Sequence, residues 1–354
     1  MAVFVGAVPK PVVEQIIRTI GFETWGNAFI CCSGSFRVDG ALKRTYPALK
    51  VHGNDVSLLT CSIGGLLTGN PLNFTFKGPL EFIEEYLDRH HDTPTDRVAA
   101  VMVAVELGQL PLNREYGQSR FAYMRDNFDR FHDKARDSLI NLLADTRIDA
   151  FHTGDFREQL ARAMDAGGGI AAFPPTYKSG YERLYSFLTE NVAWEPPEYG
   201  VWDPKALPEW ISTVEQSGVP FCILTDHEIE GRTPASIYRT ATNKPVLTYT
   251  GNAKRTSFRR TSVNGKPVKF ELIEPEDIAR HSVVELRVLP SNYATYIKRL
   301  FIAKGIVPAQ AMIDMAVMID DKLAGIIGYK SFDPLSGQHY LICDLSVSRR
   351  RPMR

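Results

Sequence analysis

The chain has 354 residues, of which 44% are hydrophobic and 23% charged, a composition that excludes a disordered or fibrous protein and fits one large or two medium globular domains. Lysine plus arginine equals aspartate plus glutamate at 41 residues each, so no overall positive field attracts nucleic acid. Any nucleic-acid surface must therefore be a local basic patch.

Cysteine usage and the length of the apolar runs indicate the compartment. The five cysteines show no C-x-x-C spacing and stand mostly in apolar runs, which is typical of a reduced protein without a zinc site. The longest apolar run, residues 98–110, is interrupted by Glu106 and is too short to cross a bilayer, and the N-terminus has no signal-peptide pattern. We expect a cytoplasmic protein that holds no metal and does not enter a membrane.

The first part of the chain predicts the opening of a doubly wound α/β sheet. Residues 11–20 form one apolar helical face, and a short buried strand at 28–32 leads into the small-residue turn around Gly34. A second strand from residue 50 ends in Asp55, 21 residues after Gly34. An acid at about 20 residues from a glycine turn meets ribose hydroxyls in nucleotide-binding units. The alternative is a glycine turn with a surface acid, and the missing triple-glycine fingerprint disfavours a dinucleotide.

The middle of the chain changes to helical periodicity. Residues 78–149 carry apolar side chains at helical spacing, and their aromatic stripe predicts a core rather than a base-stacking surface. A third strand-to-helix passage, residues 148–156, then ends in Asp155 followed by Phe156. An acid before a phenylalanine suits a site that bonds an adenine amine and covers its ring, while the alternative is that Asp155 caps the next helix.

The stretch at residues 170–181 reads I-A-A-F-P-P-T-Y-K-S-G-Y. Pro174 and Pro175 end the strand because neither donates an N–H, and the carbonyls there are left free. Tyr177 offers a flat face for a base taken out of the helix. The alternative is a strand followed by a proline-rich turn.

Two more strands, at 219–224 and 246–250, precede a basic cluster that we define as Lys254, Arg255, Arg259 and Arg260. We predict that this cluster contacts phosphates, although a solvated hairpin explains it equally well. A second unit is expected from residue 266, with a hairpin at 315–329 around an acidic turn and a last strand at 340–347.

In this order the parts resemble the Dam-type adenine-N6 DNA methyltransferases, and most closely the divergent antirestriction adenine methyltransferases of phages and mobile elements. The resemblance implies a Rossmann-like S-adenosylmethionine-dependent methyltransferase sheet over residues 1–265 with a helical insertion at about 78–149. It further implies that S-adenosylmethionine is bound at Lys10, Gly34, Phe36, Asp55 (its ribose) and Asp155 (its adenine amine), and that catalysis takes place at Phe173, Pro174, Pro175 and Tyr177.

One departure from the family pattern concerns the catalytic strand. Phe173 stands where the family has Asp or Asn, and the aromatic residue is displaced to Tyr177. Adenine's exocyclic nitrogen is a poor nucleophile, so an oxygen that accepts its hydrogens favours attack. Losing one such group typically lowers the rate about 10²–10³-fold. Asp226 or Asp155 could take its place if the base binds differently.

Residues 266–354 resemble part of a GNAT-type acyltransferase, a fold that some phage adenine-modifying enzymes of the Mom type use. The favoured function is adenine-N6 methylation of double-stranded DNA that protects phage or mobile-element DNA from restriction. The alternatives are a catalytically weak or inactive DNA-binding antirestriction protein, for which Phe173 argues, and a Mom-type acyl modification of adenine.

Overall fold

The computed structural model describes residues 8–90, 92–175, 180–239, 245–251, 256–260, 270–301, 311–333 and 338–346. The packing of the chain divides it into two compact units. Unit 1 comprises Met1–Tyr238 and Pro245–Arg259, and unit 2 comprises Arg239–Lys244 and Arg260–Arg354. The boundary predicted at residue 265 lies outside the described residues, and each unit is described by itself below.

Unit 1 is built on a mixed sheet that is parallel at its centre. Among the described residues the sheet has eight strands in the order β10-β8-β9-β7-β5-β1-β2-β4. Parallel pairing joins β4 to β2, β2 to β1, β1 to β5 and β5 to β7, whereas β9 runs antiparallel to β7. The strands are β1 (Asn27–Cys31), β2 (Lys50–Asp55), β4 (Ala150–Thr153), β5 (Gly169–Ala172), β7 (Phe221–Thr225), β8 (Ser236–Arg239), β9 (Pro245–Tyr249) and β10 (Ser257–Arg260).

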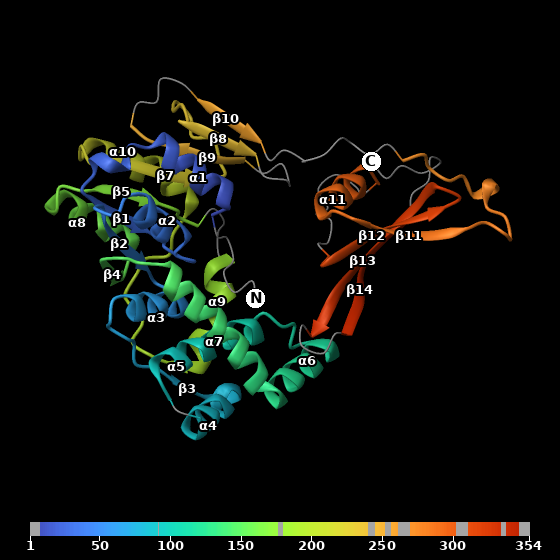
Figure 1. The fold of residues 1–354 in the computed structure, drawn as a ribbon. Coiled ribbons are helices and arrows are strands. Elements are labelled where there is room, and N and C mark those ends of the chain that lie inside the picture. The colour runs from blue at the N-terminus through green and yellow to red at the C-terminus, as the bar shows by residue number, and fades with distance from the viewer. Residues whose placement is uncertain are drawn as a thin grey trace. The chain divides into compact units, whose positions relative to one another are not determined.

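Helices cover both faces of this sheet (Figure 1), which confirms the predicted Rossmann-like architecture. α1 (Lys10–Thr19) and α2 (Arg37–Thr45) pack on one face, and α8 (Gln159–Asp165) and α10 (Leu207–Gln216) pack on the other. In β1, Ala28 and Ile30 face the first pair of helices, while Phe29 and Cys31 face the second. A parallel strand covered on both sides reads as a nearly continuous apolar run, as residues 28–31 of β1 do. The strand order reverses between β1 and β5, where ligands of such sheets bind.

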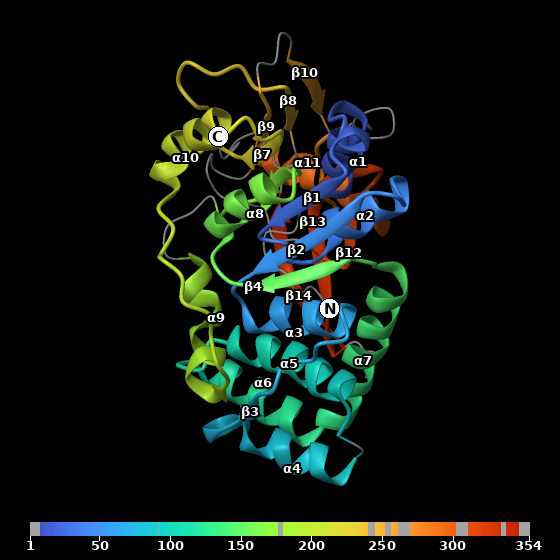
Figure 2. The same cartoon turned by 90° about the vertical axis from the view of Figure 1, so that its left-hand side faces the viewer.

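The helical block lies beyond β4, on the other side of unit 1 from β10 (Figure 2). Its central helix, α5, begins with a capping box between Thr93 and Asp96 and is buried along most of its length. Phe128 and Phe131 are buried here, so the predicted aromatic core is confirmed. The block consists of α3 (Leu58–Leu67), α4 (Glu81–Arg89), α5 (Pro94–Gly108), α6 (Glu115–Asp126), α7 (Phe128–Asp145), α9 (Gly180–Asn191) and the strand pair β3 (Thr75–Phe76) and β6 (Val192–Ala193).

Unit 2 contains an antiparallel sheet in the order β11-β12-β13-β14 among its described residues. Its members are β11 (Val284–Leu289), β12 (Ile313–Ile319), β13 (Lys322–Asp333) and β14 (Gln338–Ser346), and α11 (Ser291–Phe301) packs on one face through Ile297 and Phe301. Asp320 and Asp321 join β12 to β13 with left-handed φ angles of 49° and 64°, the signature of a tight hairpin turn. The predicted hairpin with an acidic turn is confirmed.

Short 3-10 helices complete the secondary structure at Phe22–Thr24, Gly78–Leu80, Phe156–Glu158, Pro204–Ala206 and Pro275–Asp277. In the part of the chain that the structure describes, no helix has the length and apolar character needed to span a bilayer.

Candidate functional site

The carboxyl ends of the parallel strands bring the sequence-predicted residues to one edge of the sheet. Asp55 ends β2 opposite Thr153 of β4, and Cys31 of β1 lies opposite Ala172 of β5. Gly34, Asp55, Asp155 and Pro174 therefore follow strands that end side by side. This edge includes the switch point between β1 and β5, so we treat it as the candidate site.

The turn after β1 is held in an unusual backbone conformation. Cys32, Gly34 and Phe36 have left-handed φ angles of 63°, 52° and 55°. For non-glycine residues this conformation costs about 1–3 kcal/mol each and is concentrated at functional sites. A Cβ added at Gly34 would meet Cys32 O at 3.9 Å and no nearer heavy atom among those described. The outer side of the turn is therefore open to the close approach of a ligand.

Asp55 connects this turn to the next helix. Its Oδ2 accepts the N–H of Gly34 at 3.0 Å, and its Oδ1 accepts the N–H groups of Val56 at 2.9 Å and Ser57 at 3.0 Å. The Asp55 residue is 5% exposed. Gly34 and Asp55, which stand 21 residues apart in the sequence, are thus joined directly, and Asp55 holds the turn.

Asp155 is held by more donors than its sequence context suggests. Its Oδ1 accepts Arg157 N–H at 3.0 Å and Arg157 Nε–H at 2.8 Å, and its Oδ2 accepts Arg157 Nη2–H and the Gly200 N–H, the latter at 3.1 Å. Burial acts to raise the pKa of Asp155, but hydrogen bonds from Arg157 and Gly200 outweigh it and the pKa is lowered. Asp155 caps the helical turn that follows, as one of its two sequence interpretations predicts. A carboxylate has about four acceptor sites, so an adenine amine must exchange with one of these donors.

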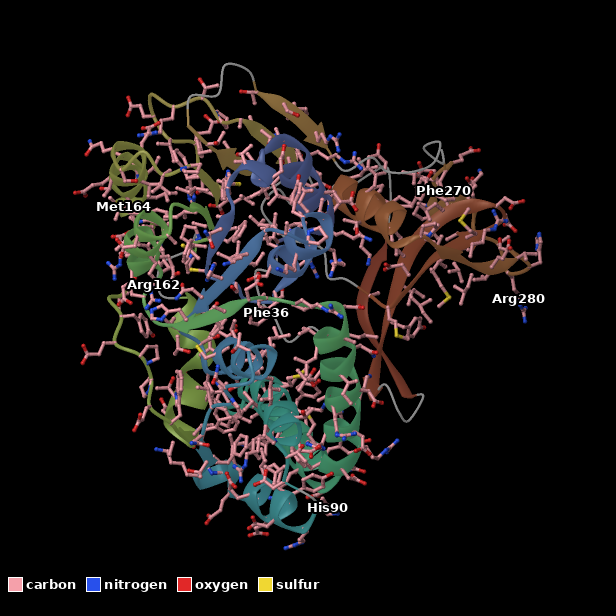
Figure 3. The ribbon with its side chains drawn as sticks, turned by 60° about the vertical axis from the view of Figure 1, so that its left-hand side comes forward. Phe36, His90, Arg162, Met164, Phe270 and Arg280 are labelled. Carbon is pink, nitrogen blue, oxygen red and sulfur yellow. The ribbon has the colours of Figure 1, made fainter. Side chains whose placement is uncertain are left out.

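Lys10 and Phe36 lie in different surroundings. Phe36 is 1% exposed and its ring lies 5.7 Å from that of Phe151, between the sheet and the helical block (Figure 3). Lys10 is exposed at the start of α1. Phe36 therefore packs as a core residue in this structure, and contact with a cofactor would be limited to its backbone.

The strand end with the double proline follows β5 directly. The Phe173 N–H donates to Cys31 O at 3.1 Å, and its half-buried side chain packs against the apolar cluster under α1 and α2. Pro174 is buried and Pro175 is half-buried. Tyr177 lies outside the described residues.

The basic cluster is only partly described. Lys254 and Arg255 lie outside the described residues, as does the side chain of Arg260, whereas Arg259 is exposed on β10. The sheet order places β7, β9 and β8 between β5 and β10. Arg259 is therefore separated from the double proline by three intervening strands.

A buried polar network that was not predicted from the sequence lies beneath the turn. Ser33 Oγ donates to Asp39 Oδ1 at 2.8 Å and accepts the Asn54 N–H at 3.1 Å. Asn54 Nδ2 donates in turn to His152 O at 3.1 Å and Gly154 O at 2.7 Å. Burial raises the pKa of Asp39 to about 7, although the hydrogen bonds from Ser33 and from its own amide lower it. The only sequence signal was an acid in the first turn of α2.

No group of three or more His, Cys, Asp or Glu residues forms a potential metal site within the described ranges.

Comparison with protein families gives two matches. A model described as phage DNA adenine methylase-like domain 1 matches residues 4–273. A model described as phage GNAT-like domain matches residues 281–354. No curated protein matches the chain.

Proposed function

The chain belongs to the phage DNA adenine methylase-like family, and on this basis we propose that it transfers a methyl group from S-adenosylmethionine to N6 of adenine in double-stranded DNA. The family match supports DNA adenine methylation as the activity. The observation that carries the site is the open Gly34 turn, hydrogen-bonded to Asp55 at the switch point of the sheet. Protection of phage or mobile-element DNA from restriction is the proposed role.

The residues at the strand edge fit the cofactor in part. S-adenosylmethionine, when bound, supplies an electrophilic methyl group on a positively charged sulfur. The open side of the Gly34 turn gives a ligand access to the backbone, and Asp55 stands where ribose hydroxyls would be held. Asp155 fits the adenine amine only if the Gly200 amide or an Arg157 N–H gives way. We propose Lys10 as an outer member of this site and the backbone of Phe36 as a cofactor contact, because the Phe36 side chain is buried.

Base recognition is proposed for the double-proline strand end. The N6 atom cannot be reached inside a duplex, so the adenine must leave the stack. The carbonyl of Pro174 then accepts one amine hydrogen, and Tyr177 stacks on the ring. The basic cluster is proposed to hold the DNA backbone. Its described member Arg259 lies on β10, the edge strand at the opposite end of the sheet from β4.

Nucleoside mass spectrometry of plasmid DNA co-expressed with the protein tests this function directly. We expect N6-methyladenine in the wild-type sample and its loss in Tyr177→Ala, because a stacking face contributes about 1–3 kcal/mol. Isothermal titration with S-adenosylmethionine measures cofactor binding independently of DNA. Plasmid without modified adenine from a well-folded wild type would exclude the methyltransferase proposal.

Two other functions each have an observation in their favour. The packing of Phe173 in the apolar cluster favours a DNA-binding antirestriction protein without chemistry. In that case the protein binds DNA but leaves no modified adenine. The GNAT-like match over residues 281–354 favours a Mom-type acyl modification, which would give a modified adenosine heavier than the methylated one.

A further inference from the structure

The strand next to the double proline also ends in polar residues. β7 pairs in parallel with β5, and Ile223 lies opposite Ala172. Two residues past that pair β7 reaches Thr225, which Asp226 and His227 follow, while β5 continues into Phe173 and Pro174. Neighbouring strands are about 4.8 Å apart. The backbone of Asp226 therefore lies next to the end of β5, where the adenine site is proposed.

Asp226 differs from the other two acids at this edge in its hydrogen bonding. The described residues place three backbone N–H groups on Asp55 and four donors on Asp155. Asp226 Oδ1 is shielded from solvent and has no hydrogen-bond partner among the described residues. His227 Nδ1 touches it as an ion-pair contact. Asp226 therefore keeps acceptor capacity for a ligand's N–H groups.

The side chain of Phe173 cannot fill this role. It is apolar, and it packs into the cluster under α1 and α2. Although Asp226 Oδ1 is shielded from solvent, the side chain as a whole is 36% exposed, so a substrate can approach the carboxylate from its exposed side. The double proline follows β5, which ends without a carboxylate. The neighbouring strand β7 is followed by the carboxylate of Asp226.

We propose that Asp226 is a catalytic residue that accepts an N6 hydrogen of the target adenine, in place of the acid that position 173 lacks. This inference rests on the proposed adenine methylation. As the bond from N6 to the methyl carbon forms, the bond from that carbon to the donor sulfur breaks and its electron pair stays on sulfur. The N6 proton moves to the Asp226 carboxylate and from there to solvent. Pro174 O accepts the second N6 hydrogen.

The test compares single-turnover methylation by the full-length wild type and by the chain carrying Asp226→Ala, Asp226→Asn or Glu228→Gln, with enzyme and S-adenosylmethionine in excess over DNA. Glu228 is an exposed acid two residues away and serves as the matched control. Asp226→Ala is expected to slow methylation by about 10²–10³-fold, the usual effect of losing one preorganised group at a reacting centre. Asp226→Asn should keep more activity than Asp226→Ala because an amide oxygen still accepts a hydrogen bond. Glu228→Gln should match the wild type.

Cofactor titration and thermal unfolding of the same variants separate the outcomes. Unchanged cofactor affinity with slow methylation supports the role of Asp226. Wild-type rates in a folded Asp226→Ala variant would overturn it, and so would a loss that lies wholly in cofactor binding. If Asp226→Ala fails to fold, the methylation rate of Asp226→Asn is compared with that of Glu228→Gln. A slower rate in Asp226→Asn supports the role of Asp226, and equal rates overturn it. A wild type that makes no N6-methyladenine refutes the proposed function itself, a result distinct from an active enzyme that tolerates Asp226→Ala.

Discussion

The buried carboxyl of Asp39 provides a direct test of the polar network beneath the turn, because a fully buried acid should make the free energy of unfolding depend on pH. Asp39 is 0% exposed, and its Oδ2 has no hydrogen-bond partner among the described residues. Its Oδ1 accepts one hydrogen bond from Ser33. Burial without full pairing favours the neutral acid, and the pKa of Asp39 is raised to about 7.

The direction of the effect follows from proton binding. An unfolded aspartate titrates near 3.8, so between about pH 4 and pH 7 the folded protein holds a proton that the unfolded chain has released. The free energy of unfolding therefore falls as pH rises through this window, and the loss is complete above the folded pKa. A shift of about three units corresponds to roughly 4 kcal/mol at about 1.36 kcal/mol per unit.

The measurement is urea unfolding of the wild type and Asp39→Asn at pH 5 and pH 8. Asparagine keeps an oxygen that accepts the Ser33 hydrogen bond but cannot ionise. Asp39→Asn is therefore expected to lose less stability between the two pH values than the wild type, and to be the more stable protein at pH 8. Asp137→Asn, at an exposed acid on α7, is the control and should keep the wild-type dependence. Equal losses of stability in Asp39→Asn and the wild type over this range would contradict a raised pKa of Asp39 in the folded protein.

Three further predictions concern the proposed site. Asp55→Ala is expected to weaken S-adenosylmethionine binding by about 1.5–3 kcal/mol in titration calorimetry, and an unchanged affinity would remove Asp55 from the site. Charge reversal of the whole basic cluster should weaken binding of all DNA sequences alike and reduce the salt slope by about 0.9 per lost phosphate contact, whereas equal slopes would identify a solvated hairpin. Phe173→Asp should lower the thermal midpoint because it places a carboxylate in the apolar cluster; a midpoint like the wild type's would show that the side chain can turn toward the site.

Local sequence patterns predicted the elements that position the site. Apolar periodicity located α1, β1 and β5, because burial of alternate or helically spaced side chains is imposed along the chain itself. The strand ends carrying Gly34 and Asp55 were also predictable, and the structure joins these two residues by a hydrogen bond of 3.0 Å, whereas the predicted ribose contact of Asp55 stays a prediction. The turn at Asp320 was predictable for the same reason, since two adjacent residues determine its geometry.

Patterns of this kind could not predict the partners that come from distant parts of the chain. The sequence near Asp155 gives no sign of Gly200, which lies 45 residues further on and supplies a backbone donor. The family resemblance implied that Phe36 lines the cofactor pocket, but Phe151 and the helical block bury its side chain. The burial of Asp39 likewise depends on Ser33 and on the strand carrying Asn54.

The number of hydrogen-bond donors around each acid gives a physical reason why the proposed adenine methylation is compatible with Phe173 in place of the family's Asp or Asn. Three acids stand at the carboxyl ends of parallel strands of one sheet, Asp55 on β2, Asp155 after β4 and Asp226 after β7, yet Asp55 and Asp155 are held by donors from the protein itself. A buried carboxylate gains more from such fixed donors than from a ligand that comes and goes. On the proposed mechanism, recognition of the adenine amine falls to the carbonyl at Pro174 and to the carboxylate of Asp226, whose Oδ1 makes no hydrogen bond among the described residues and contacts His227 Nδ1. A backbone carbonyl remains after any side-chain change, so the proposed mechanism predicts that activity is sensitive to substitution at position 226 rather than at position 173.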